Sequence, residues 1–321
     1  MFWRNEILGV MYYNGRGVAQ NYAEAEQWLR KAAQQGDTNA QFNLGVLYDA
    51  GLGVPQNSIQ WYRKAAEQND ARAQFNLGWM YAEGRGVARS DAEAVQWYRK
   101  AAEQGNEKAQ YKLGRAYDEG KGIPQDYAEA AQWYRKAALQ GYVGAQNELA
   151  MMYHNGRGVA QDHAQAMQWW RKAAEQGNPE AQHNIGVTYA KGQGVPQSYA
   201  EAVQWFRRAA EQGFSESQDA LAVMYEKGEG IPKSKDEAAK WHGKAEDTRA
   251  KEMRHMQEQH PNSSDVLAPF SNAEPIDEQL NSQFERRPVG DAARAQPQTQ
   301  QPQAPSRPQQ QQDPPAVRIS R

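Results

Sequence analysis

Three kinds of residue in this chain have types and spacings that could support chemistry. Short Gly-x-Gly motifs could cradle a phosphate group, histidines could bind a metal ion, and adjacent carboxylates such as Asp118 and Glu119 could act as an acid–base pair. Each kind of chemistry requires further residues at defined distances along the chain.

None of these requirements is met. The Gly-x-Gly motif occurs in seven places, from Gly15/Gly17 to Gly228/Gly230, and nowhere continues into the lysine signature of a P-loop. The histidines show no His-Glu-x-x-His spacing, so we expect surface side chains and no metal site. Asp118 and Glu119 are expected on a solvated turn, and no cofactor is implied. The six histidines are His154, His163, His183, His242, His255 and His260.

Composition excludes several classes of partner. The chain has 321 residues, with 37 Lys and Arg against 39 Asp and Glu, so no basic excess is available for nucleic acid. It has no cysteine, which excludes disulfides and cysteine-based metal sites. No apolar run is long enough for membrane insertion. We expect a cytoplasmic protein from the sequence as written; the alternative is a periplasmic or secreted protein whose signal peptide lies upstream.

The dominant feature is an internal repeat. The phrase VQWYRKAAEQGN, residues 95–106, returns in edited form along the chain. Its tryptophans are spaced by 33 residues once and by 36 residues five times, which is the period of a solenoid. A second phrase, LGVLY at 44–48, recurs with the same period. The seven tryptophans are Trp28, Trp61, Trp97, Trp133, Trp169, Trp205 and Trp241.

Both phrases predict helices. Ala40, Leu44, Leu47 and Tyr48 fall on one helical face. Gly45, in the middle of that helix, is expected to admit a neighbouring backbone, and the tryptophans are expected in the core. The Gly-x-Gly motifs separate the helices, Ser or Asp begins the second helix of most repeats, and Gly ends it. The sequence therefore predicts an all-α solenoid of seven helix-turn-helix repeats.

The predicted domains are an α-solenoid at 1–260 and a tail at 261–321. In the seventh repeat Arg249 replaces the glycine that ends other second helices, so a C-terminal capping helix is expected to continue to Pro261. Residues 261–321 are rich in Gln and Pro and cannot bury enough apolar surface to fold, so we predict a disordered low-complexity tail.

The combined pattern of Leu-Gly-x-x-Tyr, Gly-x-Gly-Val and Ala-x-x-Trp-Tyr-x-Lys-Ala-Ala-x-x-Gly resembles the Sel-one-like repeat family, a branch of the tetratricopeptide repeat superfamily. The resemblance covers roughly residues 4–249. It implies a right-handed α-solenoid whose first helices line a concave, protein-binding face. Known members act as scaffolds and adaptors.

The expected function is accordingly that of a non-enzymatic scaffold or adaptor. Its partner would be a protein or a peptide segment of another protein, bound by a monomeric chain. Some Sel-one-like proteins are linked to β-lactams, but this sequence contains neither Ser-x-x-Lys nor Lys-Thr-Gly. The alternative, by family analogy, is a cell-envelope enzyme or enzyme activator related to β-lactams or peptidoglycan.

Candidate binding residues lie beside the repeated Leu-Gly pair of each first helix. Three asparagines directly before the repeated Leu or Ile resemble those with which related tetratricopeptide domains hold an extended peptide. Trp79 and Arg115 replace the Val found at the same position in repeats one, two, six and seven. With aromatic residues two before Leu, they would form an apolar patch edged by a cation. The alternative is that the Phe and Asn side chains pack against the next hairpin. The candidates are Phe42, Asn43, Phe75, Asn76, Trp79, Tyr111, Arg115, His183 and Asn184.

Overall fold

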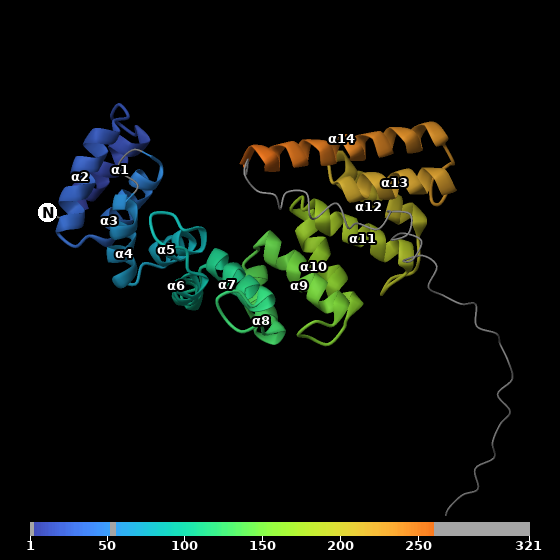
Figure 1. The fold of residues 1–321 in the computed structure, drawn as a ribbon, viewed down its shortest axis with the longest axis horizontal. Helices are drawn as coiled ribbons and strands as arrows, with labels where there is room; N and C mark the ends of the chain where they lie inside the picture. The colour runs from blue at the N-terminus through green and yellow to red at the C-terminus, as the bar shows by residue number, and fades with distance from the viewer. Residues whose placement is uncertain (1–2, 52–55, 260–321) are drawn as a thin grey trace, which may run out of the picture. The chain divides into compact units, whose positions relative to one another are not determined.

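The computed structural model describes residues 3–51 and 56–259, which form fourteen helices and no strand (Figure 1). Residues Met1–Glu258 form one compact unit. All but the last residue of the final helix belong to this unit. The predicted disordered tail at 261–321 lies outside the described residues.

The helices alternate between two kinds, as the two repeated phrases predict. The first helices of the repeats are α1 (Trp3–Asn14), α3 (Thr38–Asp49), α5 (Ala71–Glu83), α7 (Glu107–Glu119), α9 (Val143–Asn155), α11 (Pro179–Lys191) and α13 (Ser215–Lys227). The second helices are α2 (Tyr22–Gln34), α4 (Gln56–Glu67), α6 (Asp91–Glu103), α8 (Tyr127–Leu139), α10 (His163–Glu175), α12 (Tyr199–Glu211) and α14 (Lys235–Gln259). From α1 to α13 each helix packs against its neighbours in the chain, which confirms the α-solenoid.

The helix ends follow the signals in the sequence. The side chain of Asp126 accepts hydrogen bonds from two backbone N–H groups at the start of α8. Gly120 ends α7 in the left-handed conformation, with φ of 69°. Asn69 has the same φ of 69° and is the one non-glycine residue with positive φ among the described residues. It takes the place that glycine holds after the other second helices, as its position predicts.

In repeats two, three, four and six the glycine within the first helix faces an aromatic ring. At Gly45 this ring replaces the expected backbone contact, whereas at Gly78 the carbonyl oxygen of Ala94 also lies 3.1 Å from an added Cβ atom. A Cβ atom added at Gly114 would lie 2.7 Å from the ring of Tyr134, and one at Gly45 would lie 2.5 Å from Tyr62. Each of these tyrosines follows the repeated tryptophan and is almost fully buried. The hairpin therefore closes by packing this tyrosine onto the glycine of the facing helix.

The repeated tryptophans are only partly the core residues that we expected. Trp61, Trp133, Trp169 and Trp241 are buried, whereas the other three are half-buried. In each repeat the cation three residues later lies over the indole ring, as Lys136 does over Trp133 at 3.6 Å. These pairs shield one indole face from water.

Buried glutamines join successive repeats. Gln110 donates to the backbone carbonyl of Ala102, in the preceding repeat, at 3.1 Å, and accepts from Gln140, at the end of α8 in its own repeat, at 2.8 Å. The bond from the glutamine to the alanine carbonyl of the preceding repeat recurs along the chain. The bond between the two glutamines recurs within single repeats, and Thr248 takes the place of the second glutamine at the end of the series. Their buried polar atoms are thereby satisfied.

The last repeat ends in a buried ion pair. Asp219 is 3% exposed, and its carboxylate lies 2.5 Å from Nη1 of Arg249 and 3.0 Å from Nδ1 of His242. Arg249 is the residue that replaces the helix-ending glycine, and α14 continues past it to Gln259. No helix in the described part of the chain is long and apolar enough to cross a membrane.

Candidate binding face of the first helices

The first helices of repeats two to six share a face that the second helices leave half-buried. It consists of the residue before the repeated Leu or Ile and the residue two after it, and we call it the first-helix face. All of its side chains are half-buried, whereas the Leu or Ile between them is fully buried. The first-helix face comprises Asn43, Asn76, Lys112, Glu148 and Asn184, with Val46, Trp79, Arg115, Met151 and Val187.

The predicted aromatic residues two before Leu lie beside this face and pack inward. The ring centroids of Phe42 and Tyr62 are 5.9 Å apart. Phe75 and Tyr111 make the equivalent contacts with the tyrosines of α6 and α8, at 5.8 Å each. These contacts lie within one hairpin, and two of the rings also meet the next hairpin, where Arg72 lies 4.2 Å from the Phe42 centroid and Tyr142 lies 4.9 Å from Tyr111. The packing alternative therefore describes these residues better than an exposed patch.

The side chain of His183 also packs against neighbouring side chains. Its ring lies 5.4 Å from those of Phe206 and Phe214, and its Nδ1 shares a hydrogen bond of 2.9 Å with Oγ of Ser217. Burial lowers the pKa of His183 to about 4. The expectation of a surface histidine is therefore wrong for His183. Ser217 is fully buried, so its hydroxyl is closed to a substrate despite the histidine beside it.

The three candidate asparagines contact neighbouring helices. Asn43 Nδ2 donates to Oε1 of Glu6 at 3.4 Å, and Asn184 Nδ2 lies 3.6 Å from Sδ of Met151. Both partners belong to the preceding first helix. Asn76 makes a hydrogen bond with Tyr62 of the preceding second helix. The asparagines thus lie at the junctions between successive repeats.

Trp79 and Arg115 occupy equivalent positions on adjacent first helices. The guanidinium of Arg85 lies 4.7 Å from the centroid of the Trp79 ring, which packs on the cores of repeats on either side. Arg115 forms an ion pair with Glu119 one turn later on α7. Both side chains remain half-buried and are held in defined positions.

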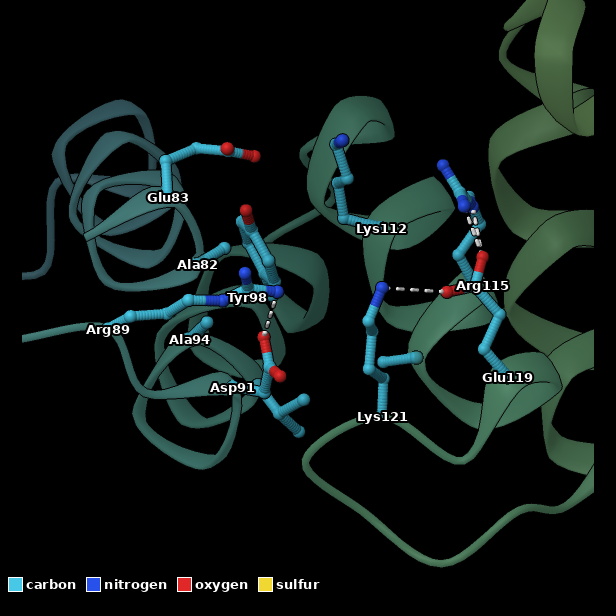
Figure 2. A pocket seen from close by; sticks show the side chains of 12 residues that line it. Ala82, Glu83, Arg89, Asp91, Ala94, Tyr98, Lys112, Arg115, Glu119 and Lys121 are labelled. Atoms are coloured by element: carbon cyan, nitrogen blue, oxygen red, sulfur yellow. Dashed lines mark hydrogen bonds and ion pairs between the residues drawn. The ribbon is translucent and has the colours of Figure 1, made fainter. Parts of the chain in front are cut away.

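Arg115 also lines a pocket between repeats three and four. The pocket has a volume of about 150 Å³. Figure 2 shows Tyr98, Asp91 and Glu83 on the side formed by α5 and α6, and Lys112 with Arg115 on the side formed by α7. Lys121 Nζ lies 3.5 Å from Glu119, and Arg89 lies 3.9 Å from Asp91. Burial, followed by the charges of Glu83 and Asp91, raises the pKa of Tyr98 above its ordinary value, so its hydroxyl is neutral.

Sequence reasoning missed two charged residues of the first-helix face. Lys112 and Glu148 stand where repeats two, three and six have asparagine, and this change of residue type was the signal for them. Burial raises the pKa of Glu148, and the nearby carboxylates of Glu180 and Asp118 add to the rise. The nine predicted residues lie on the first helices of repeats two, three, four and six. In the described residues no group of three or more acidic or histidine side chains could hold a metal ion.

Comparison with known proteins matches the repeats. The family model described as Sel1 repeat matches residues 7–37, 38–70, 71–106, 107–142, 143–178, 179–214 and 215–247. A search of curated proteins gives no match.

Two solved structures are similar over most of the described chain. One is a protective antigen of uropathogenic Escherichia coli strains that displays an SLR fold, with 42% identity and a TM-score of 0.74 over 77% of this chain. The chain spans about half of that antigen, 54% of its length. The other is a Sel1 repeat protein from Oxalobacter formigenes, with 38% identity and a TM-score of 0.65, covering 75% of this chain and 96% of the relative.

Proposed function

Because the chain belongs to the Sel1 repeat family, we propose that it is a non-enzymatic scaffold or adaptor that binds a segment of a partner protein on its first-helix face. Repeat families of this kind commonly serve as protein–protein interaction scaffolds. The proposed partner is a protein, bound by a monomeric chain.

One observation carries this proposal: the repeats agree where hairpins are joined and differ on the first-helix face. The glutamine that joins repeats is the same in Gln41, Gln74 and Gln110. By contrast, the residue two after Leu or Ile changes from Val46 to Trp79 and then to Arg115. Packing between hairpins accounts for the first kind of position. Variation in size and charge at half-buried positions is what recognition of a particular partner requires.

Of the predicted residues, Trp79 and Arg115 are the strongest candidates for contact with the partner. A half-buried Trp and Arg on adjacent helices have the composition of an interface hot spot, and their positions are already set by Arg85 and Glu119. Asn43, Asn76 and Asn184 remain in the proposal as hydrogen-bonding groups at the junctions between repeats. The remaining predicted residues pack inward and support the first-helix face from within the fold; they are Phe42, Phe75, Tyr111 and His183.

Affinity capture with the full-length protein tests the proposal. Replacing Trp79→Val together with Arg115→Ala should abolish capture of the main partner, because Val already occupies the Trp79 position in repeats two and six. The circular dichroism spectrum should remain that of the parent. The matched control replaces exposed residues of second helices, Leu139→Ala with Glu175→Ala, and should retain capture. Capture that survives the first pair of changes and is lost with the control pair would overturn the proposed face.

A further inference from the structure

The charge on the first-helix face changes from positive in repeat four to negative in repeat five. Lys112 lies on α7, and Glu148 occupies the equivalent position on α9, one repeat of 36 residues later. Neither side chain takes part in a hydrogen bond or an ion pair with any described residue. Two neighbouring charges on α7 are paired, Arg115 with Glu119 and Asp118 with Arg157. Two opposite charges on adjacent first helices are thus left for an external group.

The charge of Glu148 is poorly compensated. Its carboxylate is half-buried and faces the carboxylates of Glu180 and Asp118, which disfavour its ionised form, while Arg115 and Arg157 only partly offset them. A half-buried carboxylate among like charges is destabilising unless a cation approaches it. A Lys or Arg side chain from a partner would supply that cation.

The surroundings of Lys112 carry an excess of positive charge and would be compensated by an anion from a partner. The pocket of Figure 2 contains four cations, Arg89, Lys112, Arg115 and Lys121, against three carboxylates, Glu83, Asp91 and Glu119, which leaves an excess of one positive charge. Lys108 is exposed one turn before Lys112 on α7 and is likewise without a described ion pair. The pocket volume of about 150 Å³ gives room for one carboxylate side chain.

Resting on the proposed function, we infer that the partner segment carries one acidic and one basic residue in a set order. The acidic residue enters the pocket beside Lys112, and the basic residue meets Glu148 and Glu180. Packed helices lie about 10 Å apart, and an extended chain advances about 3.3 Å per residue. The two charges of the partner are therefore about three residues apart, and the segment crosses the first helices from α7 to α11.

Charge complementarity also distinguishes this partner from other occupants. A nucleic acid or an anionic membrane would meet repulsion at Glu148 and Glu180, and a uniformly basic peptide would meet repulsion at Lys108 and Lys112. A segment with both signs satisfies both halves of the surface. Its order of charges sets where it lies along the solenoid.

Selection from a displayed library of random peptides tests this inference. The peptides, of about twelve residues, are selected on the full-length protein and are long enough to cross several first helices. Selected peptides should share an Asp or Glu about three residues from a Lys or Arg. Changing Glu148→Lys should weaken their binding by about tenfold, which corresponds to about 1.4 kcal/mol. Peptides in which the basic residue is replaced by Glu should recover affinity for that variant.

The matched control is Glu175→Lys, an equal change of charge on an exposed second-helix position, which should leave binding unchanged. Peptides lost on the Trp79→Val, Arg115→Ala double change but indifferent to Glu148→Lys would overturn the charge order and leave the proposed function standing. Peptides indifferent to both sets of changes would overturn both. Selection of no peptide, or self-association of the chain through this face, would also overturn the inference of a linear partner segment.

Discussion

Nη2 of Arg99 in α6 donates a hydrogen bond of 2.8 Å to the hydroxyl of Tyr117 in α7, eighteen residues later and in the next repeat. The same arginine–tyrosine bond recurs at every junction from repeat one to repeat seven. The other pairs are Arg30/Tyr48, Arg63/Tyr81, Arg135/Tyr153, Arg171/Tyr189 and Arg207/Tyr225. In α14 the equivalent position is Gly243, so the series ends with the seventh repeat.

Removing one hydroxyl of this series should weaken a single junction. Tyr117→Phe keeps the ring beneath Arg99 but leaves the guanidinium without its acceptor, and we expect a loss of about 1 kcal/mol in the free energy of unfolding. The thermal midpoint should fall by about 2–4 °C. Urea unfolding followed by circular dichroism measures the change. Tyr22→Phe, at an exposed tyrosine outside the series, is the control and should change the midpoint by less than the error of the measurement.

The terminal ion pair gives a second prediction. Arg249→Gly restores the residue found at this position in other repeats, yet it leaves the buried carboxylate of Asp219 without its guanidinium. Breaking a buried pair costs roughly 3 kcal/mol. Thermal unfolding should show the loss, and adding Asp219→Asn should recover part of it because the unpaired charge is then removed. If Arg249→Gly were stabilising, the pair would not be what holds α14 in place.

Much of the fold could be predicted because each local signal is repeated. The spacing of the tryptophans and the Leu-Gly pairs set the number of repeats, and the glycine and Asn69 positions set the helix ends. The contacts between repeats could not be predicted in the same way. Arg99 with Tyr117, and Gln140 with the carbonyl of Gly105, are separated by 18 and 35 residues, and helical periodicity within one phrase says nothing about them.

The candidate site was harder to predict than the fold. A residue two before Leu lies close to both the first-helix face and the facing second helix, and only the position of Tyr62 or Phe206 shows that Phe42 and His183 pack inward. The expected role of Gly45 failed for a related reason. The sequence indicated a close approach at this glycine, but the approaching group is the ring of the tyrosine that follows the tryptophan.

The burial of His183 predicts an acid-dependent loss of stability. Its pKa in the folded chain is about 4, below its ordinary value of 6.5, so the folded state holds the neutral ring and the unfolded state binds the proton more readily. Stability is therefore fully present above pH 6.5 and declines as the pH falls toward 4. The decline from this one group should approach roughly 3 kcal/mol. Thermal or urea unfolding at a series of pH values measures it.

The repeats themselves supply a matched variant for this measurement. His183→Phe with Ser217→Ala installs the residues that repeats two and three carry at the equivalent positions, so neither a titrating ring nor an unpaired hydroxyl remains. The double variant should lose most of the dependence on pH between 6.5 and 4 that the parent shows. Glu216 and Lys191, the charged groups that act on His183, are unchanged in it. An identical pH profile in both proteins would show that His183 does not control the acid response.

Ionised Glu148 should lower the stability of the folded protein and, at the same time, bind the basic residue of the partner. Because burial and neighbouring carboxylates raise its pKa, its negative charge costs folding free energy above that pKa, and the cost disappears as the pH falls and the carboxyl is protonated. Glu148→Gln should therefore stabilise the protein at neutral pH by about 0.5 kcal/mol, a rise of about 1–2 °C in the thermal midpoint. The gain should vanish near pH 4, about where the ordinary carboxyl of the unfolded chain titrates. Glu175→Gln, at an exposed position, should show no gain at either pH.

The same Glu148→Gln change should weaken binding of the selected peptides, since the basic residue of the peptide then has no carboxylate at position 148 to pair with. Loss of stability at neutral pH would mean that the carboxylate already has a stabilising partner within the chain, and it would remove the reason to expect a cation from outside.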